Sequence, residues 1–175
     1  MFVGDSAALS RLLNERALDI AIVSEPQVDA HVRCEPVGRS RLGWFVNAGF
    51  EPVRDVLAPA DLAQLHLMML PSTARLHQTA MKWFADGDAL PSRVSICNNV
   101  AVTKYAILQG TAIGILPVRI MQEEVAAGTA KMLRISPDLD AHYVSICYQV
   151  SESGPGLSAF AGLTRELIGE YRIFV

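Results

Sequence analysis

The sequence predicts an α/β fold in which apolar strands alternate with capped helices and part of the sheet is parallel. The main evidence is residues 94–117, where an apolar strand ending at Cys97 is followed by Asn98-Asn99, a helical pattern and Gly110. Asparagine accepts backbone N–H bonds at the start of a helix, and glycine readily adopts the left-handed conformation that ends one. An apolar run at 113–116 follows, so this stretch predicts a helix between two parallel strands.

The start of the chain repeats this pattern. The polar pair Asp5-Ser6 precedes residues 7–15, where leucines at helical spacing form one apolar face. Residues 18–23, LDIAIV, then predict a buried strand. The same periodicities, interrupted by Gly and Pro, place the remaining elements. Helices are expected over 60–63, 74–85, 118–126 and 157–171, and strands or extended segments over 32–37, 42–47, 66–70, 131–135 and 142–150.

Together these segments resemble a known family. The pattern GDS-x2-L-x3-L-x4-LDIAIV comes first, PSRVSICNN follows much later, and CNN-x10-G-x3-G-ILP completes the set in one colinear order. Each piece alone is common, but the ordered set is similar to the effector-binding domain of LysR-type transcriptional regulators. The likeness covers nearly the whole chain.

This resemblance implies an α/β fold of the type 2 periplasmic-binding-protein kind, with two Rossmann-like lobes joined by two crossing strands. Lobe I is expected over about 1–46 plus 150–175, and lobe II over about 47–149. Two crossing strands form a hinge, and a ligand is expected in the cleft between the lobes.

The sequence departs from the family pattern in three places. Arg16 stands where the family often has a helix-ending glycine, and a positive φ there costs about 1 kcal/mol. Ala112 replaces the second glycine of the usual G-x-G. Compared with the family, the first lobe is expected to lack the initial strand and helix, and the winged helix-turn-helix is expected to lie outside these 175 residues.

Polar turns that follow predicted strands supply the candidate ligand-binding residues. Helix N-termini carry free N–H groups and positive potential, which suit a carboxylate or similar small anion. The resemblance also places effector contacts at such turns. The alternative is that each residue only caps its helix. The candidates are Ser6, Ser72, Thr73, Asn98 and Asn99.

Composition excludes several functions. The formal net charge is −3 and no run of Lys or Arg occurs, so we do not expect this chain to bind DNA by itself. No apolar stretch is long enough to span a membrane, and the first ten residues do not resemble a secretory signal. These features predict a cytoplasmic protein with no membrane association.

Residue patterns for catalysis and metal binding are also missing. Cys34, Cys97 and Cys147 form no C-x-x-C pair, and the four histidines have no metal-binding spacing. We expect reduced, buried thiols, with a redox sensor as the alternative. There is no G-x-S-x-G, and the glycines at 110 and 114 end a helix rather than open one. The sequence therefore predicts no enzyme, no metal and no cofactor.

The predicted function is ligand sensing and dimerisation in a LysR-type regulator that responds to a small metabolite, such as a small organic acid. DNA is expected to be bound only through a helix-turn-helix domain outside this chain. Pairing is expected through helices 7–15 and 118–126, with Ala8 and Met121 as contact candidates. The alternative function is a solute-binding protein of a transport system.

Overall fold

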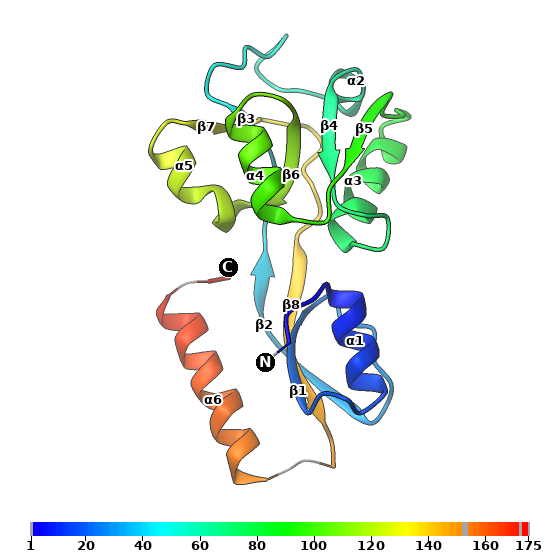
Figure 1. Ribbon diagram of the computed structural model, residues 1–175, viewed down its shortest axis with the longest axis vertical. Coiled ribbons are helices and arrows are strands. Elements are labelled where there is room, and N and C mark those ends of the chain that lie inside the picture. Colours follow the sequence, from blue (N-terminus) through cyan, green and yellow to red (C-terminus); the bar gives the residue numbers. More distant parts are fainter. Residues whose placement is uncertain (1, 152–153, 172, 175) are drawn as a thin grey trace. The chain divides into compact units, whose positions relative to one another are not determined.

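The computed structural model describes residues 2–151, 154–171 and 173–174. The chain forms two units (Figure 1): residues 1–40 with 141–175 make unit 1, and residues 41–140 make unit 2. The predicted lobes were 1–46 with 150–175, and 47–149. The observed units differ from them because β3 (Leu42–Asn47) belongs to unit 2 and β8 (His142–Gln149) to unit 1. β3 pairs only within the unit 2 sheet, and β8 pairs only within the unit 1 sheet.

Unit 1 contains a three-stranded antiparallel sheet in the order β1-β8-β2. Its core is formed by Leu13, Val23, Val32 and Cys147, so the apolar face of the first helix packs on the sheet as its leucine spacing predicts. The elements of this unit besides β8 are α1 (Ser6–Asn14), β1 (Ile20–Ser24), β2 (Val32–Ser40) and α6 (Pro155–Glu170).

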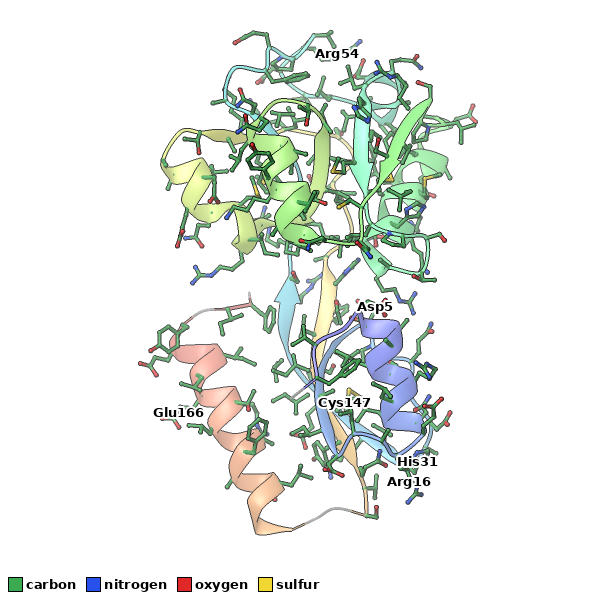
Figure 2. All side chains as sticks on the ribbon, in the orientation of Figure 1. Asp5, Arg16, His31, Arg54, Cys147 and Glu166 are labelled. Atoms are coloured by element: carbon green, nitrogen blue, oxygen red, sulfur yellow. A yellow bond between two sulfur atoms is a disulfide. The ribbon has the colours of Figure 1, made fainter. Side chains whose placement is uncertain are left out.

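Both ends of α1 are defined by local chemistry (Figure 2). Asp5, not Ser6, is the N-cap, because the Asp5 carboxylate accepts a 2.7 Å hydrogen bond from the backbone N–H of Ala8. Arg16 follows the helix with φ 57°, the left-handed conformation expected where the family often has glycine.

The cysteine prediction was wrong. Cys34 and Cys147 form a disulfide between β2 and β8, and only Cys97 is a free thiol. The pairing arises because the two residues lie directly opposite each other in the antiparallel ladder, with their Cα atoms 4.1 Å apart. The ring closed by this bond spans 113 positions and includes all of unit 2.

Unit 2 contains a five-stranded mixed sheet in the order β5-β4-β6-β3-β7. β4 is parallel to both β5 and β6, while β3 is antiparallel to β6 and β7. The predicted strand–helix–strand unit at 94–117 is confirmed as β5-α4-β6, and β4 lies between its two strands. The elements are α2 (Pro59–Ala63), β4 (His66–Met69), α3 (Arg75–Asp86), β5 (Arg93–Ile96), α4 (Val100–Leu108), β6 (Ile113–Pro117), η1 (Val118–Met121), α5 (Gln122–Ala126) and β7 (Ala130–Met132).

The centre of the unit 2 sheet, at β3 and β6, is buried on both faces. Trp44 and Val46 of β3 face one core with α3, and Phe45 between them faces a second core with α4. This follows from the period of two in a strand, which sends successive side chains to opposite faces. On the first face Trp44, Trp83 and Phe84 form a cluster with ring centroids 5.1–6.0 Å apart.

The predicted helix at 118–126 is a single 3-10 turn, η1, followed by the short helix α5. Met121 ends the 3-10 turn with no exposed surface, because it packs into the core with Phe45 and Ile107. Met121 is therefore unavailable for the dimer contact that we expected, whereas Ala8 on α1 is partly exposed.

Candidate functional site

The two turns predicted to bind ligand lie at the carboxyl ends of two adjacent strands in the unit 2 sheet. β4 and β5 are adjacent parallel strands with Met69 opposite Ile96, so the turns that follow them emerge side by side (Figure 1). The backbone N–H of Cys97 donates a 2.8 Å hydrogen bond to the carbonyl oxygen of Met69 and joins the two turns. Ser72 and Thr73 belong to the first turn, and Asn98 and Asn99 to the second.

Asn99 is a helix cap. Its side-chain oxygen accepts hydrogen bonds from the backbone N–H groups of Ala101, at 2.9 Å, and Val102, at 3.2 Å. Its carbonyl oxygen accepts the hydroxyl of Thr103 at 3.1 Å. Capping thus accounts for asparagine at position 99 without any ligand.

The other three residues are not caps. α3 begins at Arg75, and its N-cap, Ala74, has no side chain that can accept a hydrogen bond. The alternative that Ser72 or Thr73 only caps this helix therefore does not hold, since the helix begins at Arg75. Ser72, Thr73 and Asn98 are exposed, and their side chains make no hydrogen bond to the described residues. Their polar groups are available to a ligand.

Helix N-termini and an arginine favour negative charge at the strand ends that carry these side chains. α3 and α4 both begin here, and each presents the positive end of its helix dipole. The first N–H groups of α3 have no side-chain cap, whereas those of Ala101 and Val102 in α4 are paired with Asn99. Arg75 adds a full charge at the first residue of α3, where its Nη1 donates a 3.0 Å hydrogen bond to Oε1 of Gln78. Sequence reasoning missed Arg75, although its position directly after the predicted turn was the available signal.

Ser6 belongs to unit 1 and already has a structural bond. Its Oγ accepts a 3.2 Å hydrogen bond from the backbone N–H of Ser24 and joins the start of α1 to the end of β1. The Ser6 hydroxyl proton has no acceptor among the described residues.

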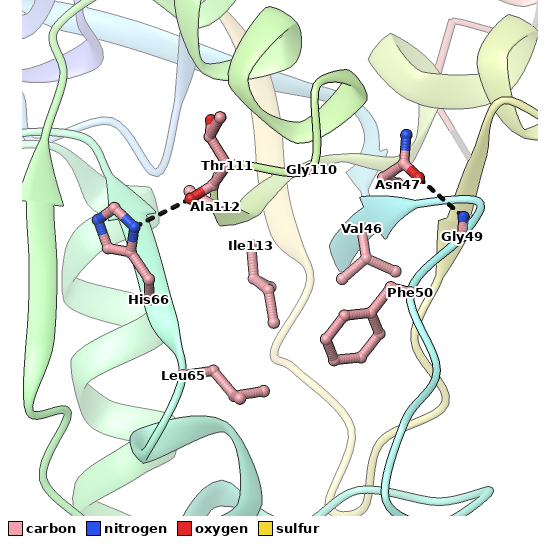
Figure 3. Close-up of a pocket in the computed structure, with 10 residues that line it drawn as sticks. All are labelled: Val46, Asn47, Gly49, Phe50, Leu65, His66, Gly110, Thr111, Ala112 and Ile113. Atoms are coloured by element: carbon pink, nitrogen blue, oxygen red, sulfur yellow. Dashed lines mark hydrogen bonds between the residues drawn. The ribbon is translucent and has the colours of Figure 1, made fainter.

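A cavity of about 350 Å³ lies at the opposite end of the unit 2 strands (Figure 3). It contains none of the predicted residues. His66 lies at its side with both ring nitrogens occupied: Nδ1 donates to the carbonyl oxygen of Thr111 at 3.0 Å, and Nε2 lies 2.8 Å from Oγ of Ser95. Asn47 is likewise occupied, by the carbonyl oxygen of Leu108 and the N–H of Gly49. The polar side chains here hold loops in place.

Within residues 2–151, 154–171 and 173–174 no group of three or more His, Cys, Asp or Glu side chains is placed to hold a metal ion. Among the same residues, no helix combines the length and apolar character needed to cross a bilayer.

The fold occurs in solved regulators. The chain matches the reduced OxyR regulatory domain of Pseudomonas aeruginosa with a TM-score of 0.74 and 15% identity, over 94% of this chain and 80% of that one. It matches the BenM effector-binding domain with its effector benzoate with a TM-score of 0.74 and 16% identity, over 99% of this chain and 79% of that one. A full-length OxyR variant from Pseudomonas aeruginosa matches with a TM-score of 0.77 and 16% identity, over 97% of this chain and 57% of that protein.

At these identities the structural matches show the fold, which is that of type 2 periplasmic binding proteins. No curated protein matches the sequence. The model of the LysR substrate binding domain matches residues 1–168. The chain therefore belongs to the LysR substrate-binding domain family.

Proposed function

We propose that this domain senses a small organic acid in a cytoplasmic LysR-type regulator, through the turns that precede α3 and α4. The observation that carries the proposal is the pair of adjacent turns whose Ser72, Thr73 and Asn98 side chains have no partner among the described residues. Two helix N-termini and Arg75 supply the positive potential that a carboxylate requires. Asn99 shapes the second turn.

Family membership supports the regulatory role. LysR regulators oligomerise and bind DNA through a separate N-terminal domain, and the family is a regulator domain, not an enzyme family. We propose that this chain likewise senses the ligand while a separate domain binds DNA, since the chain has a net charge of −3 and spans 57% of full-length OxyR. The solute-binding alternative is not favoured by these matches. The neighbour BenM has benzoate as its effector, which supports an organic acid as the ligand class.

The proposal predicts that Thr73→Ala and Asn98→Ala each weaken binding of the acid by roughly tenfold or more. A hydrogen bond to a charged group contributes about 1.5–3 kcal/mol, and about 1.4 kcal/mol corresponds to a factor of ten. Calorimetric titration with a panel of small mono- and dicarboxylates identifies an acid that binds and then gives the affinity of each variant.

Stability measurements separate this role from helix capping. Thr73→Ala and Asn98→Ala should change the free energy of unfolding by less than about 0.5 kcal/mol, because both side chains are exposed and unpaired. Asn99→Ala is the matched control, and the loss of its two cap bonds should destabilise the domain by about 1 kcal/mol. Unchanged affinity in both Thr73→Ala and Asn98→Ala would contradict the proposed site.

A further inference from the structure

The hydrogen-bond ladder between β3 and β6 ends beside the cavity of about 350 Å³ in unit 2 (Figure 3). In an antiparallel ladder, every second pair of opposed residues exchanges backbone hydrogen bonds. The N–H of Val118 donates to the carbonyl oxygen of Arg41 at 2.9 Å, so the series of hydrogen-bonded pairs can be counted from there. The last pair in the register, Phe45 opposite Gly114, belongs to this series.

The next pair of the series, Asn47 with Ala112, is not formed. The carbonyl oxygen of Asn47 accepts the N–H of Phe50 at 3.0 Å instead. The N–H of Asn47 points toward β6, because it is the next residue, Ala48, that donates to Thr129 on the β7 side, at 3.1 Å. The N–H of Asn47 and both backbone polar groups of Ala112 thus have no partner in the described part of the chain.

These unpaired groups call for a binding partner. Ala112 is only 7% exposed, and buried backbone groups without a partner are rare in folded proteins unless water or a ligand binds them. Both Asn47 and Ala112 line the cavity. The side chains of Asn47 and His66 are already hydrogen-bonded, so the free donors and the free acceptor identified here belong to the backbone.

The rest of the cavity wall is largely apolar. Figure 3 shows four apolar side chains pointing toward one another across the space, those of Val46, Phe50, Leu65 and Ile113. The volume lies at the lower end of the range for ligand pockets, roughly 300–1,000 Å³. The cavity therefore combines two backbone donors and one backbone acceptor with an apolar surface of the size of a small ring system.

The charges around the cavity favour a neutral ligand. α4 ends at Leu108, and Gly110 lies on the cavity wall just beyond that end. The C-terminal end of a helix carries partial negative charge, which disfavours a carboxylate. Lys131 lies 3.4 Å from the carbonyl oxygen of Phe50, but its charge is balanced by Glu51 at 3.9 Å.

We propose that this cavity is a second binding site, which takes a small neutral cyclic amide with an apolar body. An amide held in a ring is cis, so its carbonyl oxygen and its N–H lie along one edge. That edge pairs with the N–H and the carbonyl oxygen of Ala112, as a neighbouring strand would, and the N–H of Asn47 is a second donor to the same oxygen. The apolar body lies against Phe50 and Leu65.

Titration of the native chain with 2-quinolone, followed by calorimetry and amide chemical shifts, tests the proposal. We expect saturable binding, with large shifts of the amide protons of residues 47 and 112. N-Methyl-2-quinolone has no N–H and should bind at least about fivefold more weakly, because it leaves the carbonyl oxygen of Ala112 unpaired. 2-Naphthoate, an acid of similar size, should not shift these two amides.

Variants locate the binding. Phe50→Ala removes part of the apolar wall and should weaken binding of 2-quinolone by about fivefold or more, whereas Phe50→Leu should recover most of the affinity. Leu90→Ala removes an exposed apolar side chain elsewhere in unit 2 and should leave the affinity unchanged. The double variant Thr73→Ala with Asn98→Ala should also retain this binding, so failure at one site is distinguished from failure at the other.

The comparison of the two quinolones on the native chain decides the question if Phe50→Ala perturbs the fold. No saturable binding of 2-quinolone would overturn the proposal and leave water as the partner of the unpaired groups. Equal affinity for the N-methyl compound, or binding that does not shift the amides of residues 47 and 112, would overturn it as well.

Discussion

Replacing Phe84 with alanine is expected to lower the free energy of unfolding of unit 2 by about 3–5 kcal/mol. Phe84 has no exposed surface and contacts both Trp44 and Trp83, with ring centroids 5.7 Å and 5.1 Å away. Truncation loses the favourable free energy of transferring the ring out of water. It also leaves a cavity, which the closely packed residues around it can fill only in part.

Tryptophan fluorescence during urea unfolding measures this effect directly. The chain has two tryptophans, and both lie in the Phe84 cluster of unit 2, so their signal reports on that unit. Leu90→Ala is the control, because Leu90 is 77% exposed and its loss should change stability by less than about 0.5 kcal/mol. A loss below about 1 kcal/mol for Phe84→Ala would show that the aromatic cluster does not form the core described here.

Removing the Cys34–Cys147 disulfide is expected to destabilise unit 1 by about 2–4 kcal/mol. The bond constrains the unfolded chain, and on the chain-entropy account its effect grows with the length of the ring it closes, here 113 positions. The double variant Cys34→Ala with Cys147→Ala should behave like the native chain treated with a dithiol reductant. The midpoint of unit 2 unfolding, followed by tryptophan fluorescence, should not change.

Circular dichroism of the oxidised and reduced chain, followed alongside tryptophan fluorescence, separates the two units. Cys97→Ser is the matched control, since Cys97 is a free thiol outside the unit 1 sheet and its change should not mimic reduction. Identical unfolding of the oxidised and reduced native chain would contradict a stabilising disulfide.

Local structure was largely predictable because its causes lie close together in the chain. Asn99 caps α4 as expected, and Gly110 ends that helix with φ 69°, because cap and stop chemistry depends on neighbouring residues. Arg16 has φ 57° at the position where the family often has a helix-ending glycine, and it was the resemblance that drew attention to it.

Features that depend on pairing between distant strands were not predictable. Nothing in a strand pattern places Cys34 opposite Cys147, since that requires the register of β2 against β8. The unit boundaries likewise depend on distant pairing, of β8 with β1 and β2 and of β3 with β6 and β7. At the candidate site, the sequence indicated the polar turns, but the structure was needed to separate Asn99, whose oxygen is occupied, from Thr73 and Asn98.

The central claim is that an organic acid binds where α3 and α4 begin. Amide hydrogen exchange of the native chain, with and without a carboxylate selected by titration, tests it most directly. The account predicts slower exchange at residues 75–77 and 98–100 when the acid is bound, because the N–H groups at the start of α3 and in the turn before α4 have no cap bond and can hold it. Binding of the acid with unchanged exchange in both segments would contradict the account.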